Sequence, residues 1–92
     1  MNKELELSNI FKIAEGVRAR NEDFGLLIVS KTTPAMSVNM DGKFVWELID
    51  GKNSLSDIIS KVNEEYELKD VKKNVCAIID GFLQLNLISV IG

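Results

Sequence analysis

The chain has 92 residues, of which 46% are apolar, so it has the length of one small domain whose core has to be rich in hydrophobic side chains. Its 11 basic and 14 acidic residues give a net charge of −3, which argues against a nucleic-acid-binding protein because such proteins concentrate basic charge. The absence of histidine and the single cysteine exclude a Cys/His catalytic pair, a Ser-His-Asp triad and a zinc site built from several such ligands.

The apolar residues of the first sixteen positions follow no clear helical or strand periodicity. The segment "LELSNIFKIAEG" allows either a short strand at Ile10–Ala14 or a stretch that packs over the edge of the domain, and we assign no element there. We therefore expect an N-terminal extension over residues 1–16 and a single folded domain over residues 17–92.

Three strands are predicted next, because the apolar period is two. They are "VRARN" from Val17, "FGLLIVS" after a connection at Glu22 and Asp23, and "AMSVNM" (Ala35–Met40) after the turn "KTTP" around Pro34. Short connections of this kind join neighbouring antiparallel strands. The last strand is short and polar on one face, which is typical of a sheet edge.

A short helix follows, because the apolar period changes from two to about 3.6 after the third strand. Asn39 or Asp41 can cap its N-terminus, and Gly51 stands where a left-handed C-terminal cap is expected. Its apolar stripe comprises Phe44, Val45, Leu48 and Ile49.

A second helix is predicted from Ser54, with Asp57 three residues later in a weaker form of the capping box. Its apolar face comprises Leu55, Ile58, Ile59, Val62 and Tyr66. A third helix is predicted from near Asp70 to about Leu85, and Asn86 is a plausible terminating residue. The final "LISVI" fits either a closing strand or an apolar tail.

The apolar face of the third helix is unusually wide, at roughly half of the circumference. One stripe comprises Val71, Val75, Ile78, Phe82 and Leu85, and an adjoining flank comprises Cys76, Ile79 and Leu83. Two interpretations stand: the flank lines a groove, or it packs on the sheet or on the terminal "LISVI". Within such a helix, Cys76 is interpreted as a small buried apolar residue and not as a reactive thiol.

Other functional signals are absent. The six glycines form neither a G-x-G-x-x-G nor a P-loop spacing, the start "MNKELELSNIF" has no secretory pattern, and no apolar run approaches the ~18 residues of a membrane span. We therefore predict a cytoplasmic protein without enzyme activity, cofactor or bound metal.

The run "LLIVSKTTPAMSVNMDGKFVWELIDGKNSLSDIISKVNEEY", followed by "V..II..FL..NLI", resembles the PqqD-like family. This family is the stand-alone form of the recognition element of ribosomally synthesised and post-translationally modified peptides (RiPPs). The likeness covers about Val17–Ile88 and is most specific from Asn39 through "WELIDG" to "SLSDII". The chain departs mildly from the family at Val38, where leucine is frequent, and at Asn86, where glycine is frequent.

The resemblance implies an α+β fold, in which a three-stranded antiparallel sheet is followed by three helices in a winged-helix-like arrangement. It implies binding of the leader segment of a precursor peptide and its presentation to a modifying enzyme, often a radical SAM enzyme. Related proteins assist lasso-peptide leader proteases or quinone-cofactor maturation, and the sequence does not separate these systems. A winged-helix DNA-binding protein is the remaining rival, which the net negative charge disfavours.

In the family, the leader adds as a strand to the third strand, with its apolar side chains against the third helix. Carried onto this chain, those elements are Ala35–Met40 and Val71–Leu85. The predicted peptide-binding residues are Ala35, Met36, Ser37, Val38, Asn39, Lys72, Val75, Cys76, Ile79 and Leu83.

Two further features carry open alternatives. Lys72 and Lys73 either attract an acidic leader or serve solubility. Trp46, off the apolar stripe of its helix, either contacts the partner enzyme or covers the N-terminal segment.

Overall fold

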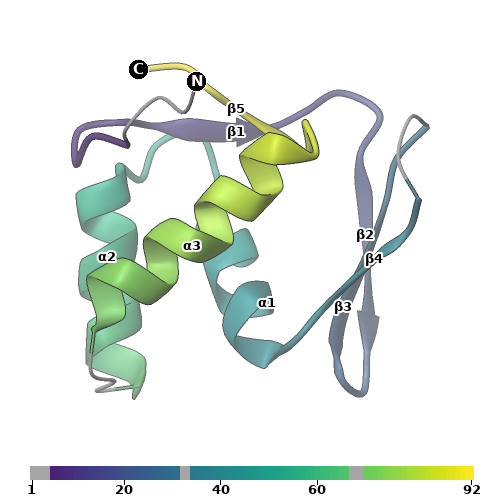
Figure 1. Cartoon of the computed structure of the whole chain (residues 1–92), viewed down its shortest axis with the longest axis horizontal. Helices are drawn as coiled ribbons and strands as arrows, with labels where there is room; N and C mark the ends of the chain where they lie inside the picture. Colours follow the sequence, from purple (N-terminus) through teal and green to yellow (C-terminus); the bar gives the residue numbers. More distant parts are fainter. Residues whose placement is uncertain (1–4, 32–33, 67–69) are drawn as a thin grey trace.

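The computed structural model describes residues 5–31, 34–66 and 70–92, which form two small antiparallel sheets and three helices (Figure 1). In chain order the elements are β1 (Phe11–Ile13), β2 (Arg18–Glu22), β3 (Gly25–Val29), β4 (Met36–Val38), α1 (Met40–Glu47), α2 (Leu55–Tyr66), α3 (Val71–Gln84) and β5 (Ile88–Val90). The α+β architecture with a three-stranded antiparallel sheet and three following helices is as predicted.

The larger sheet is a meander with strand order β2-β3-β4, so β4 lies at an edge. Glu22 pairs with Gly25 across the two-residue hairpin connection, and Leu27 of β3 pairs with Ser37 of β4. The hairpin connection therefore consists of Asp23 and Phe24, one residue beyond the prediction. Part of the predicted turn "KTTP" lies at residues 32–33, outside the described residues.

The second sheet pairs β1, near the start of the chain, with β5, near its end, and both strands lie along the top of Figure 1. Phe11 of β1 is fully buried and pairs with Val90. The segment is also tied to the start of α2, because the N–H of Leu55 donates to the carbonyl of Asn9 at 2.8 Å. Residues that the sequence left without an assignment thus contribute a strand and a core side chain, and "LISVI" contains a closing strand.

The predicted helix signals are present in the structure. The side chain of Asn39 accepts from the Gly42 N–H at 2.9 Å, and Ser54 and Asp57 exchange side-chain-to-backbone hydrogen bonds at 3.0 and 3.2 Å. Asn86, at φ 59°, ends α3 in a Schellman motif, because the Leu87 N–H donates to the Phe82 carbonyl at 3.0 Å.

The end of α1 differs from the prediction. The helix is capped at Leu48, whose backbone stays right-handed, and Gly51, at φ 80°, lies three residues later in the connection to α2. That connection is held by Asp50, whose carboxylate accepts from the N–H groups of Lys52 and Asn53 at 2.9 Å each.

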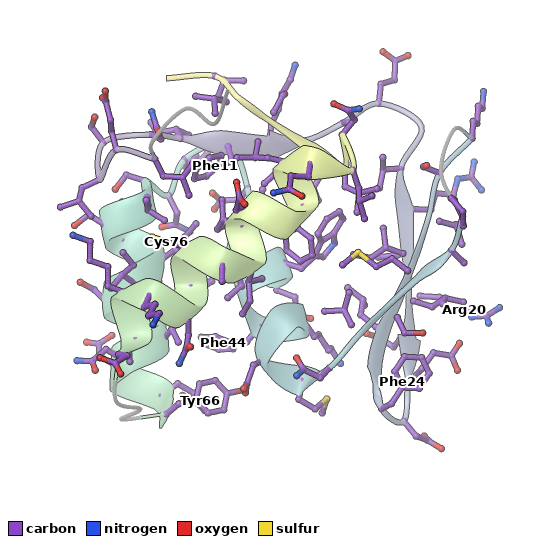
Figure 2. All side chains as sticks on the ribbon, in the orientation of Figure 1. Phe11, Arg20, Phe24, Phe44, Tyr66 and Cys76 are labelled. Carbon is purple, nitrogen blue, oxygen red and sulfur yellow. The ribbon has the colours of Figure 1, made fainter. Side chains whose placement is uncertain are left out.

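One apolar core joins both sheets and all three helices. The buried hydrophobic residues are Phe11, Leu26, Ile28, Val38, Val45, Trp46, Ile49, Leu55, Ile58, Val62, Val71, Val75, Ile79, Phe82, Leu87 and Ile88. At its margin the rings of Phe44 and Tyr66 pack edge to face, 5.3 Å apart, and join α1 to α2 (Figure 2). No helix in the described ranges has the length and hydropathy needed to cross a bilayer.

Trp46 belongs to this core, with 6% of its surface exposed. Its indole packs edge to face on Phe82 of α3, with ring centroids 5.1 Å apart. This burial excludes an exposed contact of Trp46 with a partner enzyme, because its ring packs on α3 inside the core. Its covering role over the N-terminal segment stays a prediction.

Candidate functional site

Among the described strands β4 lies at an edge of its sheet, and the ladder pattern shows which way the backbone groups of Ser37 point. In an antiparallel ladder, directly opposed residues alternate between hydrogen-bonded and non-hydrogen-bonded pairs. The pair Glu22–Gly25 closes the hairpin, so Leu27 directs its N–H and C=O toward β2. Its partner Ser37 consequently directs its own N–H and C=O away from β3, toward the open edge.

A groove of about 610 Å³ lies between this edge and α3. It is lined by Phe24, Met36, Ser37, Val38, Asn39, Gly42, Ala77, Ile78, Gly81 and Phe82. None of these side chains is charged, and most are apolar. The lining therefore favours apolar side chains, while the strand edge offers one donor and one acceptor.

Gly25 and Gly42 bring the chain close together at the end of the groove where β4 runs into α1. A Cβ at Gly25, whose φ is 145°, would collide with the carbonyl oxygen of Val38. A Cβ at Gly42 would collide with the Val38 side chain. Both glycines are therefore required for the close contact of the hairpin and α1 with β4.

Phe24 stands at the tip of the β2–β3 hairpin and borders the same groove (Figure 2). Its side chain is 49% exposed, which is unusual for an aromatic residue of this size. Its ring therefore adds an exposed apolar surface to the lining of the groove.

A smaller depression of about 310 Å³ continues the groove toward the start of α3. The two share Asn39, Ala77 and Ile78, and the second is further lined by core residues such as Val71 and Val75. Asp41 is the one acidic residue in this lining. The two depressions therefore adjoin along α3.

The predicted strand residues are mostly gathered at this site. Met36, Ser37, Val38 and Asn39 all line the groove, whereas Ala35 is exposed just before β4 and does not line it. Because alternate residues of a strand point to opposite faces, Met36 and Val38 share the face toward the helices.

The predicted residues of α3 lie elsewhere on the helix. Ile79 is fully buried, and Val75 is buried and reaches only the smaller depression. Cys76 and Leu83 are half-buried against the core, and Figure 2 shows Cys76 on the flank of α3 that faces away from β4. Lys72 is exposed, and at about 100° per residue it lies opposite Gly81 around the helix.

The structure corrects which flank of α3 borders an open cleft. The flank of Cys76, Ile79 and Leu83 packs on the core, and the opposite flank, with Ala77 and Gly81, lines the groove. The signal that sequence reasoning missed is the pair of small residues one turn apart. Phe24 was likewise missed, because only the hairpin geometry brings it to the groove.

A family profile described as coenzyme PQQ synthesis protein D (PqqD) matches residues 26–88. The chain belongs to the PqqD family. The matched residues of this PqqD-family chain include β4, α1 and α3, and hence every residue that lines the groove except Phe24. A comparison with curated protein sequences finds no significant match.

Solved structures support the same fold. The PqqD truncation of PqqCD from Methylobacterium extorquens, described as a functional and stand-alone RiPP recognition element, superposes with a TM-score of 0.76 at 17% identity, covering 94% of this chain and 95% of that one. TbiB1 in complex with the TbiA(beta) leader peptide superposes at 0.75 and 16% identity, covering 85% and 94%. A lasso peptide synthetase B1 complexed with its leader peptide superposes at 0.75 and 13%, covering 86% and 96%.

Proposed function

We propose that this protein binds the leader segment of a ribosomally synthesised precursor peptide as a fourth strand on β4. The observation that carries the proposal is the outward-facing backbone of Ser37 beside an uncharged, largely apolar groove. The membership of the PqqD family and the leader complexes among its structural relatives support it.

Strand addition suits a leader because backbone hydrogen bonds do not depend on peptide sequence, whereas side-chain pockets do. A peptide residue opposite Ser37 exchanges hydrogen bonds with it and points its side chain to the outer face of the sheet. The residues before and after it point toward α3 and into the groove. The proposed site therefore comprises Met36–Asn39 of the strand, with Ala77, Ile78, Gly81 and Phe82 of α3.

The proposed role is recognition without catalysis: the protein holds the leader and presents the rest of the precursor to a modifying enzyme, a radical SAM enzyme. Within the described ranges, no three Cys, Asp or Glu side chains are grouped as a metal site requires. The groove likewise offers only a hydroxyl and an amide as polar side chains. This lining suits binding of a peptide and provides no acid, base or charged nucleophile.

A lasso-peptide system is the second candidate, because one of the similar structures is a lasso peptide synthetase B1 complexed with a leader peptide. In that case the enzyme served is a leader protease. The gene neighbourhood tests between the two systems: a radical SAM gene beside this one would favour the first system, and a protease gene would favour the second. The DNA-binding rival has less support, because the groove is uncharged and the net charge is −3, and a mobility shift at low salt tests it.

The test is a titration of ¹⁵N-labelled protein with a synthetic leader peptide from the precursor encoded beside the gene. We expect amide shifts concentrated in Met36–Asn39 and in Ala77–Phe82, and a scrambled leader serves as the control. Shifts that cluster instead on the exposed face of α2, between Asp57 and Glu64, would show that the leader does not add to β4.

A further inference from the structure

Gly81 lies in the interior of α3, where glycine lowers helix stability relative to alanine. Its backbone is right-handed helical, so the conformation does not require glycine. A Cβ placed on Gly81 meets no heavy atom within 4 Å, so close packing in the free protein does not require it either. The space over Gly81 is part of the groove that faces β4.

Ala77 stands one helical turn before Gly81 and lines the same groove. Two residues four apart on a helix are separated by ~6 Å along its axis. Two residues that are two apart on a strand are separated by ~6.8 Å. In Figure 1, α3 and β4 run along the same diagonal in opposite directions, and both line the groove. The spacing of Ala77 and Gly81 on the helix therefore matches the spacing of alternate residues on a strand added to β4.

A strand that pairs with the outward backbone of Ser37 sends every second side chain toward α3. The two side chains next to the paired residue therefore meet the two small positions of the helix. Ile78 and Phe82 provide apolar surface alongside, and no charged residue lines this part of the groove.

We infer that the bound peptide presents two apolar side chains to α3, separated by one residue, and that the one over Gly81 is bulky. This inference rests on the proposed function and concerns which leaders the groove accepts. Gly81 is then a specificity-determining residue: its missing side chain leaves the volume that a leucine or an aromatic ring of the peptide fills.

The test uses fluorescein-labelled nonapeptides without charged side chains, with threonine at every second position. Two central positions separated by one residue are both alanine, both leucine or both phenylalanine. Their affinities are compared for the wild type, Gly81→Ala, Gly81→Leu and Lys72→Leu. The last variant adds the same side chain on the opposite side of α3 and serves as the matched control. Thermal melting and light scattering are measured for each protein.

The wild type should bind the leucine or phenylalanine peptide about tenfold or more tightly than the alanine peptide, because only the larger side chains fill the groove. Gly81→Leu should lose that preference while melting no lower than the wild type, since leucine is the better helix former. Lys72→Leu should bind like the wild type.

Three results would overturn the inference alone. The first is that all three peptides bind equally well to the wild type and that Ser37→Pro abolishes this binding. Strand addition would then stand, but the groove would have no side-chain preference. The second is a clear drop in melting temperature for Gly81→Ala, which would mean that the fold itself requires the glycine. The third is that the wild type is a dimer in the absence of peptide and that Gly81→Leu is a monomer. The groove would then be occupied by a second copy of the chain. If no peptide binds, including the natural leader, the proposed function fails together with the inference.

Discussion

The ring of Phe82 meets the indole of Trp46 edge to face, at a centroid distance of 5.1 Å and an interplanar angle of 84°. Phe82 also lines the groove, so a single ring belongs both to the candidate site and to the core. Trp46 is the only tryptophan in the chain, and its emission therefore reports on the environment of this ring pair.

Phe82→Leu should lower the free energy of unfolding by about 1–2 kcal/mol, because it removes the aromatic pair and leaves part of the ring volume empty. It should also weaken leader binding and change the Trp46 emission. Phe44→Leu is the control: it removes the ring contact with Tyr66 away from the groove, at a smaller cost because Phe44 is only half-buried. Urea unfolding followed by tryptophan fluorescence measures the stability, and equal loss of binding in both variants would argue against a role of Phe82 in the site.

Ser37→Pro should preserve the fold and abolish leader binding. The proline removes an N–H that faces the open edge, and proline is tolerated on edge strands. Val38→Pro is the control, since the N–H of Val38 faces β3 and its loss should lower the melting temperature by several degrees. Circular dichroism melting and peptide titration should be run on both variants, and full binding by Ser37→Pro would refute strand addition.

Ile79→Asp should be strongly destabilising, because a carboxylate would replace a fully buried side chain with no partner for the charge. Ala77→Asp should instead fold normally and weaken binding of the leader, since Ala77 is exposed and lines the groove. Far-ultraviolet circular dichroism at 25 °C separates the two variants. A folded Ile79→Asp protein would contradict the orientation of α3 described above.

Gly25→Ala should cost about 3 kcal/mol or more, because the methyl group would meet the backbone of Val38 and Asn39 and because φ is 145°. For a domain of this size, that loss lowers the melting temperature by about 12 °C or more. Gly81→Ala should leave the melting temperature unchanged or raise it slightly, since its Cβ meets open space. Calorimetry measures the melting temperatures of both variants. Similar values for Gly25→Ala and Gly81→Ala would disprove the prediction.

Asp50 should contribute a small, acid-sensitive stabilisation. The N–H groups of Asn53 and Lys52 donate to its carboxylate and hold the pKa of Asp50 below its ordinary value of 3.8. A carboxyl whose pKa is lowered by folding stabilises the protein above the unfolded pKa and loses that effect as the pH falls through the folded pKa. The wild type should therefore exceed Asp50→Asn in stability at neutral pH, and the difference should shrink below about pH 3.8. If the stability difference between the two proteins instead grew on acidification, the proposed effect of Asp50 would be wrong.

The sequence by itself determined the elements whose signals are local. The change of apolar period after Met40, the caps at Asn39 and Ser54 and the left-handed Asn86 are properties of a few neighbouring residues, so they could be predicted in chain order. The edge position of β4 was also predictable, because its short length and polar alternate face belong to the strand itself.

Only the tertiary structure decided the pairing of β1 with β5 and the rotation of α3. Phe11 and Val90 are far apart in the chain, and no local pattern specifies their contact. An apolar arc covering half of a helix can turn either flank to the core, and the periodicity of the arc is the same in both orientations. Long-range packing of Phe82 on Trp46 and of Ile79 in the core selects one of them, and that selection leaves Ala77 and Gly81 facing the open edge of β4.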